Sequence, residues 1–164
     1  MAKRKSAFDI NPHKANMKIT INSAMIGVLF FMLTFILASG QTKFNFLVLA
    51  QLVLAIPLLY VSTLTYSKIA YWQEFEAWDF FGWMISNLGN TIVLNAIGLM
   101  VASISRGLAL TYFLLIILLM SIYSIINISY MAETSHIKSS RFFKLVFFLV
   151  VLLVGGLVPF LLMA

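Results

Sequence analysis

Residues 80–131 decide the fold of this chain: FFGWMISNLGNTIVLNAIGLMVASISRGLALTYFLLIILLMSIYSIINISYM, with Arg106 as the only charged residue. One helix crosses the hydrocarbon core of a bilayer with about 20 residues, so this stretch is long enough for two crossings. Arg106 and Gly107 form its only break. The stretch therefore predicts two antiparallel membrane helices that are joined at the sequence SRG.

The composition extends this conclusion to the whole chain. Of the 164 residues, 62% are hydrophobic and only 10% are charged, whereas soluble proteins carry about 25% charged residues. A soluble domain of this length cannot bury so much apolar surface. The sequence predicts an all-α integral membrane protein, and its lack of cysteine excludes disulfides, thiolate metal sites and cysteine nucleophiles.

Three further apolar stretches bring the number of predicted membrane helices to five. The predicted spans are residues 19–39, 45–66, 80–105, 108–131 and 142–163. Pro57 lies inside the second span and predicts a kink, because proline lacks a backbone donor. We expect residues 1–18 to form a basic cytoplasmic head and residues 19–163 to form the transmembrane helix bundle.

The basic residues predict the orientation of the bundle. With the N-terminus in the cytoplasm, all but two of the 11 Lys and Arg residues lie on the cytoplasmic side, the exceptions being Lys43 and Arg106. This distribution follows the positive-inside rule and places the C-terminus outside. We expect the protein in a bacterial-type inner (plasma) membrane.

Basic and aromatic side chains at the ends of the spans are expected to anchor the chain at the membrane surface. These anchors are Lys3, Arg4, Lys5, Lys14, Lys18, Trp72, Trp78 and Trp83. The basic head is expected to bind anionic lipid headgroups, and docking onto an acidic cytoplasmic partner is the alternative.

The third span contains three asparagines, although an unpaired polar group in hydrocarbon costs several kcal/mol. On a helical projection Asn87, Asn90, Thr91 and Asn95 fall within one face of about 140°. Other spans carry polar or small residues that are expected to face them. These are Gln51 and Thr65 in the second span, Asn127 in the fourth, and Ser23, Gly27, Thr34 and Ala38 in the first.

This polar face supports two functions. The first is an oligomeric channel or facilitator-type transporter, with a path lined by uncharged side chains for a small neutral solute or a cation. The alternative is a non-catalytic structural or assembly subunit of a larger membrane complex, in which the same side chains bond between helices. The expected partners are the lipid bilayer and either further copies of the chain or other membrane subunits, and no nucleic acid.

The ionisable residues argue against an enzyme, because none lies near the middle of a span. Both histidines, His13 and His136, lie outside the predicted spans, and we expect no cofactor.

One charged cluster is expected on the cytoplasmic side, where it would bind a divalent cation or form an acidic vestibule. Its members are Glu74, Glu76, Asp79, Glu133 and His136. As an alternative, Asp79 caps the third helix and Glu76 interacts with the positive end of its dipole. A lipid enzyme with a carboxylate–metal site is the third and least favoured hypothesis.

Overall fold

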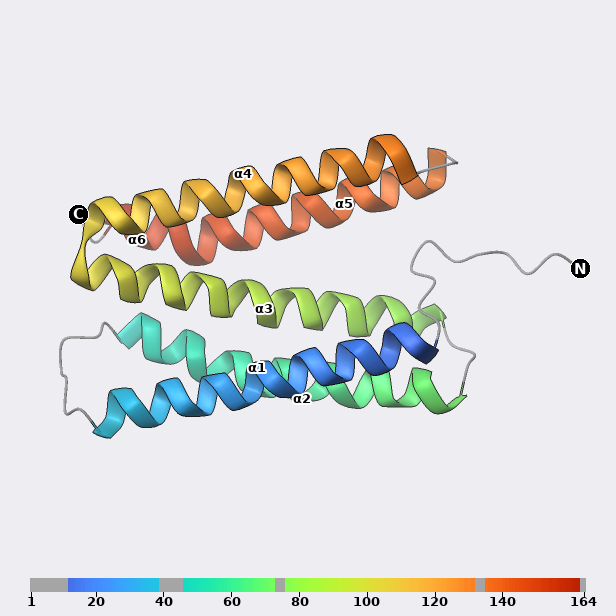
Figure 1. The fold of residues 1–164 in the computed structure, drawn as a ribbon, viewed down its shortest axis with the longest axis horizontal. Coiled ribbons are helices and arrows are strands. Elements are labelled where there is room, and N and C mark those ends of the chain that lie inside the picture. The colour runs from blue at the N-terminus through green and yellow to red at the C-terminus, as the bar shows by residue number, and fades with distance from the viewer. Residues whose placement is uncertain (1–11, 39–45, 73–75, 132–134, 163–164) are drawn as a thin grey trace, which may run out of the picture. The chain divides into compact units, whose positions relative to one another are not determined.

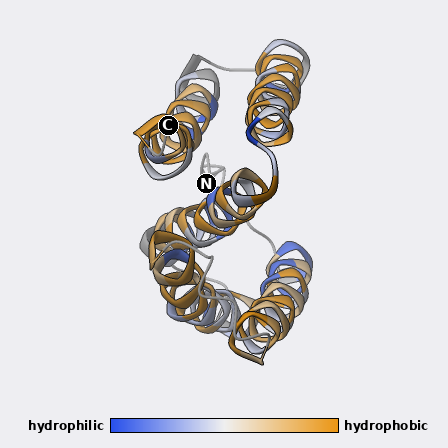
Figure 2. Ribbon diagram, turned by 90° about the vertical axis from the view of Figure 1, so that its left-hand side faces the viewer, coloured by the Kyte–Doolittle hydropathy of each residue, from blue (hydrophilic) through white to orange (hydrophobic). Residues whose placement is uncertain are grey.

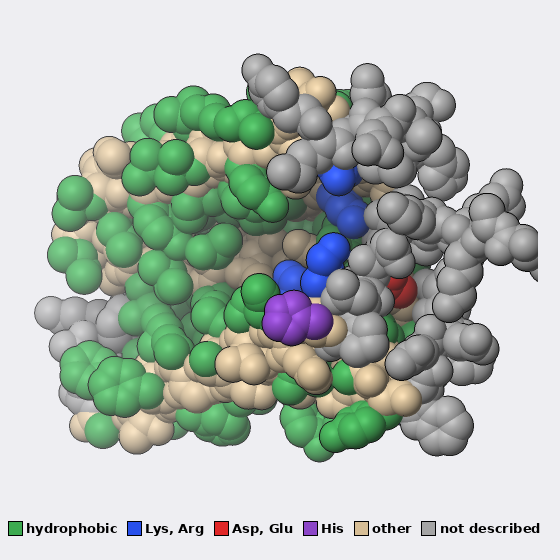
Figure 3. Space-filling view, turned by 45° about the vertical axis from the view of Figure 1, so that its right-hand side comes forward, with side chains coloured by type: hydrophobic (Ala, Val, Ile, Leu, Met, Phe, Trp, Pro, Cys, Tyr) green, Lys and Arg blue, Asp and Glu red, His purple; other side chains and the backbone are tan. Residues whose placement is uncertain are grey.

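The computed structural model describes residues 12–38, 46–72, 76–131 and 135–162, and within these ranges every residue except Ser105 is helical (Figure 1). The elements are α1 (Pro12–Ala38), α2 (Phe46–Trp72), α3 (Glu76–Ile104), α4 (Arg106–Met131), α5 (Ser135–Leu152), the π-helical turn η1 (Leu153–Leu157) and α6 (Val158–Leu162). Hydrophobic residues predominate along these helices (Figure 2), and hydrophobic side chains predominate among the described side chains on the face drawn in Figure 3.

Within the described residues, five helical stretches are long and apolar enough to cross a membrane. They are His13–Ala38, Phe46–Tyr71, Trp78–Ile104, Arg106–Ser129 and Ser139–Leu162. The prediction of an all-α membrane bundle with five spans is therefore confirmed, and the protein is an integral membrane protein.

The first helix begins at Pro12 rather than near residue 19, so that residues 12–18 of the predicted basic head are helical. Proline fits the first position of a helix, because the backbone N–H that it lacks would have no intrahelical partner there. The Asn11–Pro12 pair therefore marks the start of a membrane helix. The second helix continues on both sides of Pro57.

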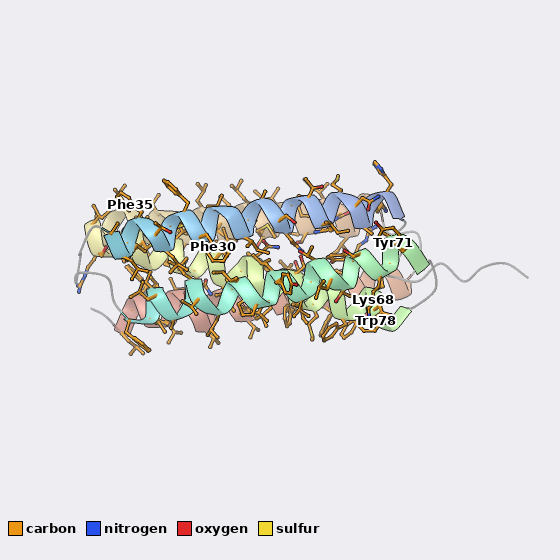
Figure 4. All side chains as sticks on the ribbon, turned by 90° about the horizontal axis from the view of Figure 1, so that it is seen from below. Phe30, Phe35, Lys68, Tyr71 and Trp78 are labelled. Carbon is orange, nitrogen blue, oxygen red and sulfur yellow. The ribbon has the colours of Figure 1, made fainter. Side chains whose placement is uncertain are left out.

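The chain forms two compact units, which we name the N-terminal unit (Met1–Asn90) and the C-terminal unit (Thr91–Ala164). In the N-terminal unit, α1 and α2 are antiparallel neighbours along their lengths (Figures 1 and 4). The buried residues of α1 recur every seven positions, at Ala15, Asn22, Leu29 and Ile36. Seven of the nine buried residues of α2 alternate in steps of four and three, at Val48, Leu52, Ala55, Leu59, Ser62, Tyr66 and Ile69, and the other two, Gln51 and Thr65, each precede one of them. This spacing is the heptad pattern of coiled-coil packing.

The heptad corrects one prediction about α1. Ser23, Gly27, Thr34 and Ala38 were expected to face other helices, but all four are exposed. A Cβ atom added to Gly27 would have no neighbouring atom within 4 Å. The reason is the register of the helix, since one residue turns a side chain by about 100° and the interface contains Asn22 instead of Ser23.

In the C-terminal unit, α3 and α4 form the predicted hairpin, and its connection is the single residue Ser105 (Figure 1). The backbone N–H of Leu108 donates a hydrogen bond to Ser105 Oγ over 3.4 Å. Ser105 is thus the N-cap of α4, because its side chain accepts from the third residue of the helix. The predicted break at SRG is confirmed.

The core of the C-terminal unit surrounds the buried ring of Phe113 on α4. A Cβ atom at Gly98 would lie 2.4 Å from Phe113 Cζ, and one at Gly156 would lie 2.7 Å from Phe113 Cε1. The ring of Phe160 lies 6.0 Å from that of Phe113, centroid to centroid. A side chain at position 98 or 156 would overlap the aromatic ring unless that ring shifted, so the packing favours glycine at both positions.

Gly156 belongs to η1, where the helix widens just before Pro159. Proline cannot donate to the carbonyl four residues earlier, and its ring clashes with that carbonyl in a regular α-helix. The turn is instead closed by a hydrogen bond from Val158 N–H to Leu153 O, which is a π-helical pairing.

Candidate functional site

A chain of hydrogen bonds joins the three helices of the N-terminal unit. Asn22 Nδ2 on α1 donates to Ser62 Oγ on α2 over 3.0 Å, and Ser62 Oγ donates to the backbone oxygen of Gly82 on α3 over 3.2 Å. Ser86 Oγ on α3 donates to Asn22 Oδ1 over 3.3 Å. Asn22 therefore uses both ends of its amide, one toward each neighbouring helix. We name Asn22, Ser62 and Ser86 the polar layer.

The polar layer is enclosed by its own helices. Asn22, Ser62 and Ser86 are all buried, with at most 1% of each residue exposed. Asn22 lies about 15 Å along α1 from Pro12, at 1.5 Å per residue, which places it well inside a membrane helix. An interhelical hydrogen bond in a bilayer contributes about 0.6 kcal/mol on average and about 1.7 kcal/mol at most.

Two of the predicted path-lining asparagines bond to the backbone of α3 itself. Asn87 Nδ2 donates to Trp83 O and Asn90 Nδ2 to Ser86 O, each over 2.8 Å. Asn90 Nδ2 also lies 3.4 Å from Ser86 Oγ, so it extends the polar layer by one helical turn. Both asparagines are half-buried.

A buried tyrosine lies next to the polar layer. Tyr66 on α2 packs against Gly82, where a Cβ atom would be 3.3 Å from Tyr66 Cε1. By distance and angle its hydroxyl makes no hydrogen bond within the described residues. The buried carboxylate of Asp79 and the hydroxyl of Ser86 are close enough to affect it electrostatically. The N-terminal part of α3 thus places the Asp79 carboxylate and the Ser86 hydroxyl near the Tyr66 hydroxyl of α2.

The same end of the N-terminal unit carries aromatic and basic side chains, as Figure 4 shows for Lys68, Tyr71 and Trp78. Lys68 Nζ lies 4.5 Å from the centre of the Trp78 ring, which is a cation–π contact. Tyr71 is exposed. This combination is typical of the boundary between hydrocarbon and water.

In the C-terminal unit the third asparagine, Asn95, binds the backbone of another helix. Asn95 Nδ2 donates to Val151 O over 3.0 Å. Its Oδ1 is directed at Gly156, where a Cβ atom would lie only 2.4 Å away. A Cα–H group donates weakly to a carbonyl oxygen at such close helix contacts. Asn95 therefore binds the last membrane segment at the beginning of its π-helical turn.

The remaining predicted polar residues are placed as follows. Gln51, Thr65 and Thr91 are buried, and Thr65 Oγ1 donates to Val61 O over 2.8 Å. Asn127 on α4 accepts two hydrogen bonds from Arg141 on α5, through its backbone oxygen and its Oδ1. Tyr112 Oη donates to Leu94 O over 3.1 Å and links α4 to α3.

The structure describes little of the predicted acidic cluster. Glu74 and Glu133 lie outside the described residues, and the side chains of Glu76 and His136 are not described. Among the side chains that are described, no group of three or more metal-ligating residues comes together. A cation site at this end of the molecule stays a prediction.

The predicted surface anchors are only partly described. Lys3, Arg4 and Lys5 lie outside the described residues, as does the side chain of Trp72. Lys14 is exposed, whereas Lys18 and Trp78 are half-buried. Trp83 is 8% exposed and lies beside Phe80, with ring centres 6.1 Å apart, and its place at the membrane surface stays a prediction.

Sequence reasoning missed Asn22 and Ser86, two of the three residues in the polar layer. The signal for Asn22 was its place in the seven-residue series that runs from Ala15 to Ile36. Ser86 lies one helical turn before Asn90 and so shares its face. No protein-family model, curated protein or solved structure matches this chain.

Proposed function

We propose that the protein is a non-catalytic membrane subunit that acts by presenting a rigid helical surface to other membrane proteins. The observation that carries this proposal is the polar layer. Asn22, Ser62 and Ser86 bond to one another and are buried, so they stabilise helix contacts and offer no free groups to a solute. Interhelical bonding of this kind is the usual role of polar residues in membrane bundles.

The exposed helices supply the surface that such a subunit needs. Of the residues in the most apolar stretch of α4, only 11% are buried by the rest of the chain, compared with 50% in the corresponding stretch of α3. The outer side of α4 carries Leu114, Leu118 and Ile122, with Tyr123 as an exposed aromatic residue. Lipid or another membrane helix is expected to cover this side. We also propose that the protein lies in the inner membrane with its N-terminus in the cytoplasm. A reporter fused after Ala164 tests this orientation, because it should then be active on the outside of the membrane.

Transport is the second candidate function, and Asn90 is the observation that favours it. Its amide nitrogen bonds within α3, and no described residue binds its Oδ1. The residue is half-buried. A carbonyl oxygen of this kind, next to a buried polar layer, is suited to binding water, a small neutral solute or a cation.

A flux measurement with matched variants separates the two functions. The purified full chain is reconstituted in liposomes, and the flux of water, glycerol and monovalent cations is compared with that of protein-free vesicles. The subunit proposal predicts no excess flux for the wild type. An excess flux that Asn90→Leu abolishes, while the free energy of unfolding is unchanged, would overturn the subunit proposal and support transport.

A complementary measurement asks whether the polar layer serves assembly. Oligomeric state and stability are measured in lipid nanodiscs for Asn22→Leu and for the neighbouring exposed variant Ser23→Leu. We expect Asn22→Leu to weaken the fold and Ser23→Leu to leave it intact. Equal stability of the two variants would remove the structural basis of the proposal.

A further inference from the structure

Arg141 is fixed against the C-terminal part of α4 by two hydrogen bonds to one residue. Its Nη1 donates to the backbone oxygen of Asn127 and, over 2.8 Å, to Asn127 Oδ1. An arginine near the end of a helix stabilises the last carbonyl groups in this way. The contact uses one nitrogen of the guanidinium, so the other N–H donors of its planar fork remain for a further acceptor.

The charge of Arg141 is not neutralised by this contact, because Asn127 is uncharged. Residues 91–164 contain four basic residues, Arg106, Lys138, Arg141 and Lys144, and only one acidic residue, Glu133. Three of these basic residues, Lys138, Arg141 and Lys144, belong to the first ten residues of α5, so positive charge is concentrated at the beginning of that helix.

The position of Arg141 near the start of a membrane span indicates which groups surround it. It is the third residue of the membrane span Ser139–Leu162, and that span is longer than the about 20 residues needed to cross the hydrocarbon. We therefore expect Arg141 to lie at the depth of the lipid headgroups. The next two residues, Phe142 and Phe143, are 59% and 49% exposed, as expected for aromatic side chains among lipids at the interface.

We propose that Arg141, held in place by Asn127, binds the phosphate of an anionic phospholipid. A guanidinium matches two phosphate oxygens with two parallel hydrogen bonds, which a lysine cannot do. Fixing the side chain on α4 beforehand reduces the entropy lost on binding. The anionic headgroup then supplies a negative charge for Arg141, which the uncharged Asn127 does not provide. This inference does not depend on the proposed function.

The test uses the full chain in nanodiscs that contain phosphatidylcholine with a minor fraction of phosphatidylglycerol. Native mass spectrometry measures how strongly phosphatidylglycerol is enriched in the lipid that stays bound after release. We expect Arg141→Gln to lower this enrichment by about tenfold, as for the loss of a charged hydrogen bond. The matched control Arg106→Gln removes one positive charge from the same unit and should leave the enrichment unchanged.

Two further variants address the geometry and keep the test decisive if Arg141→Gln does not fold. Arg141→Lys keeps the charge but lacks the fork, and Asn127→Leu keeps Arg141 but removes the Oδ1 acceptor. Both are expected to lower the enrichment less than Arg141→Gln does. Wild-type enrichment in Arg141→Gln or in both of these variants would overturn the proposal, and so would an equal loss in Arg106→Gln. Wild-type enrichment that persists in millimolar inorganic phosphate supports a lipid site, whereas its complete loss would show that the site prefers free phosphate and would overturn the lipid assignment.

Discussion

The helices of the two units are held together by different interactions. Lipid is as apolar as leucine, so helices in a bilayer are not driven together by the hydrophobic effect. The N-terminal unit is joined by hydrogen bonds between side chains on α1, α2 and α3. The C-terminal unit is joined by a ring that fits between two glycines, with Asn95 bonding to backbone. The centre of the N-terminal unit is thus a set of bonded polar side chains, whereas the centre of the C-terminal unit is an aromatic ring packed against glycines.

This difference predicts which substitutions each unit tolerates. Changes of volume should damage the C-terminal unit most, because its contacts depend on shape. Changes of polarity should damage the N-terminal unit, and by less, because each hydrogen bond in a bilayer contributes little. The following predictions start with the largest expected effect, and all use the free energy of unfolding measured by steric trapping in bicelles.

Phe113→Ala is expected to have the largest effect, a loss of about 3 kcal/mol, because it leaves a cavity between Gly98, Gly156 and Phe160. The matched control is Phe142→Ala in the same unit, whose side chain is largely exposed to lipid. It should change the free energy by less than about 1 kcal/mol, since lipid fills the space. Equal losses would show that the Phe113 ring is not a packing centre.

Gly156→Ala comes next, with an expected loss of about 2 kcal/mol from overpacking against Asn95 and Phe113. Gly27→Ala in the N-terminal unit is the counterpart, because its Cβ would meet no atom. That variant should be as stable as the wild type or gain up to about 1 kcal/mol from the better helix propensity of alanine. A loss at Gly27 as large as that at Gly156 would contradict the packing of both units.

Asn22→Leu is expected to cost about 1 kcal/mol, because Ser62 and Ser86 lose their partner in the interior of the bundle. Ser23→Leu changes the adjacent exposed residue and should leave the free energy within about 0.5 kcal/mol of the wild type. If Ser23→Leu is the more damaging of the two, the register of α1 is wrong.

Asn90→Leu is expected to have the smallest effect, below about 0.5 kcal/mol, because its described hydrogen bonds are to its own helix. The same unfolding measurement gives this value. A loss as large as that of Asn22→Leu would mean that Asn90 contacts another helix or chain.

The sequence predicted the class of fold, the five spans and the hairpin at SRG, because these depend on length, hydropathy and one strong break. It did not predict which face of α1 is buried. Small residues at Ser23 and Gly27 indicated one face, whereas the heptad that contains Asn22 and Leu29 determines another. In hydrocarbon both faces are apolar enough to meet lipid, so hydropathy cannot distinguish them.

The polar residues show a similar limit. The sequence shows that polar residues occur on α3, but it does not show what they bond to. Asn95 bonds to Val151 O and Asn87 to the backbone of its own helix, and every residue type carries a backbone oxygen, so these partners cannot be recognised from residue types. The π-helical turn before Pro159 could not be predicted from the sequence either. Only the positions of Asn95 and Phe113 in the structure show what Gly156 contacts.

The most direct test of the central claim is a double-mutant cycle between Asn22 and Ser62. The free energies of unfolding of Asn22→Ala, Ser62→Ala and the double variant give the coupling between the two side chains. A bond that joins α1 to α2 predicts a favourable coupling between about 0.6 and 1.7 kcal/mol. A coupling indistinguishable from zero would show that the two residues do not join the helices of the N-terminal unit.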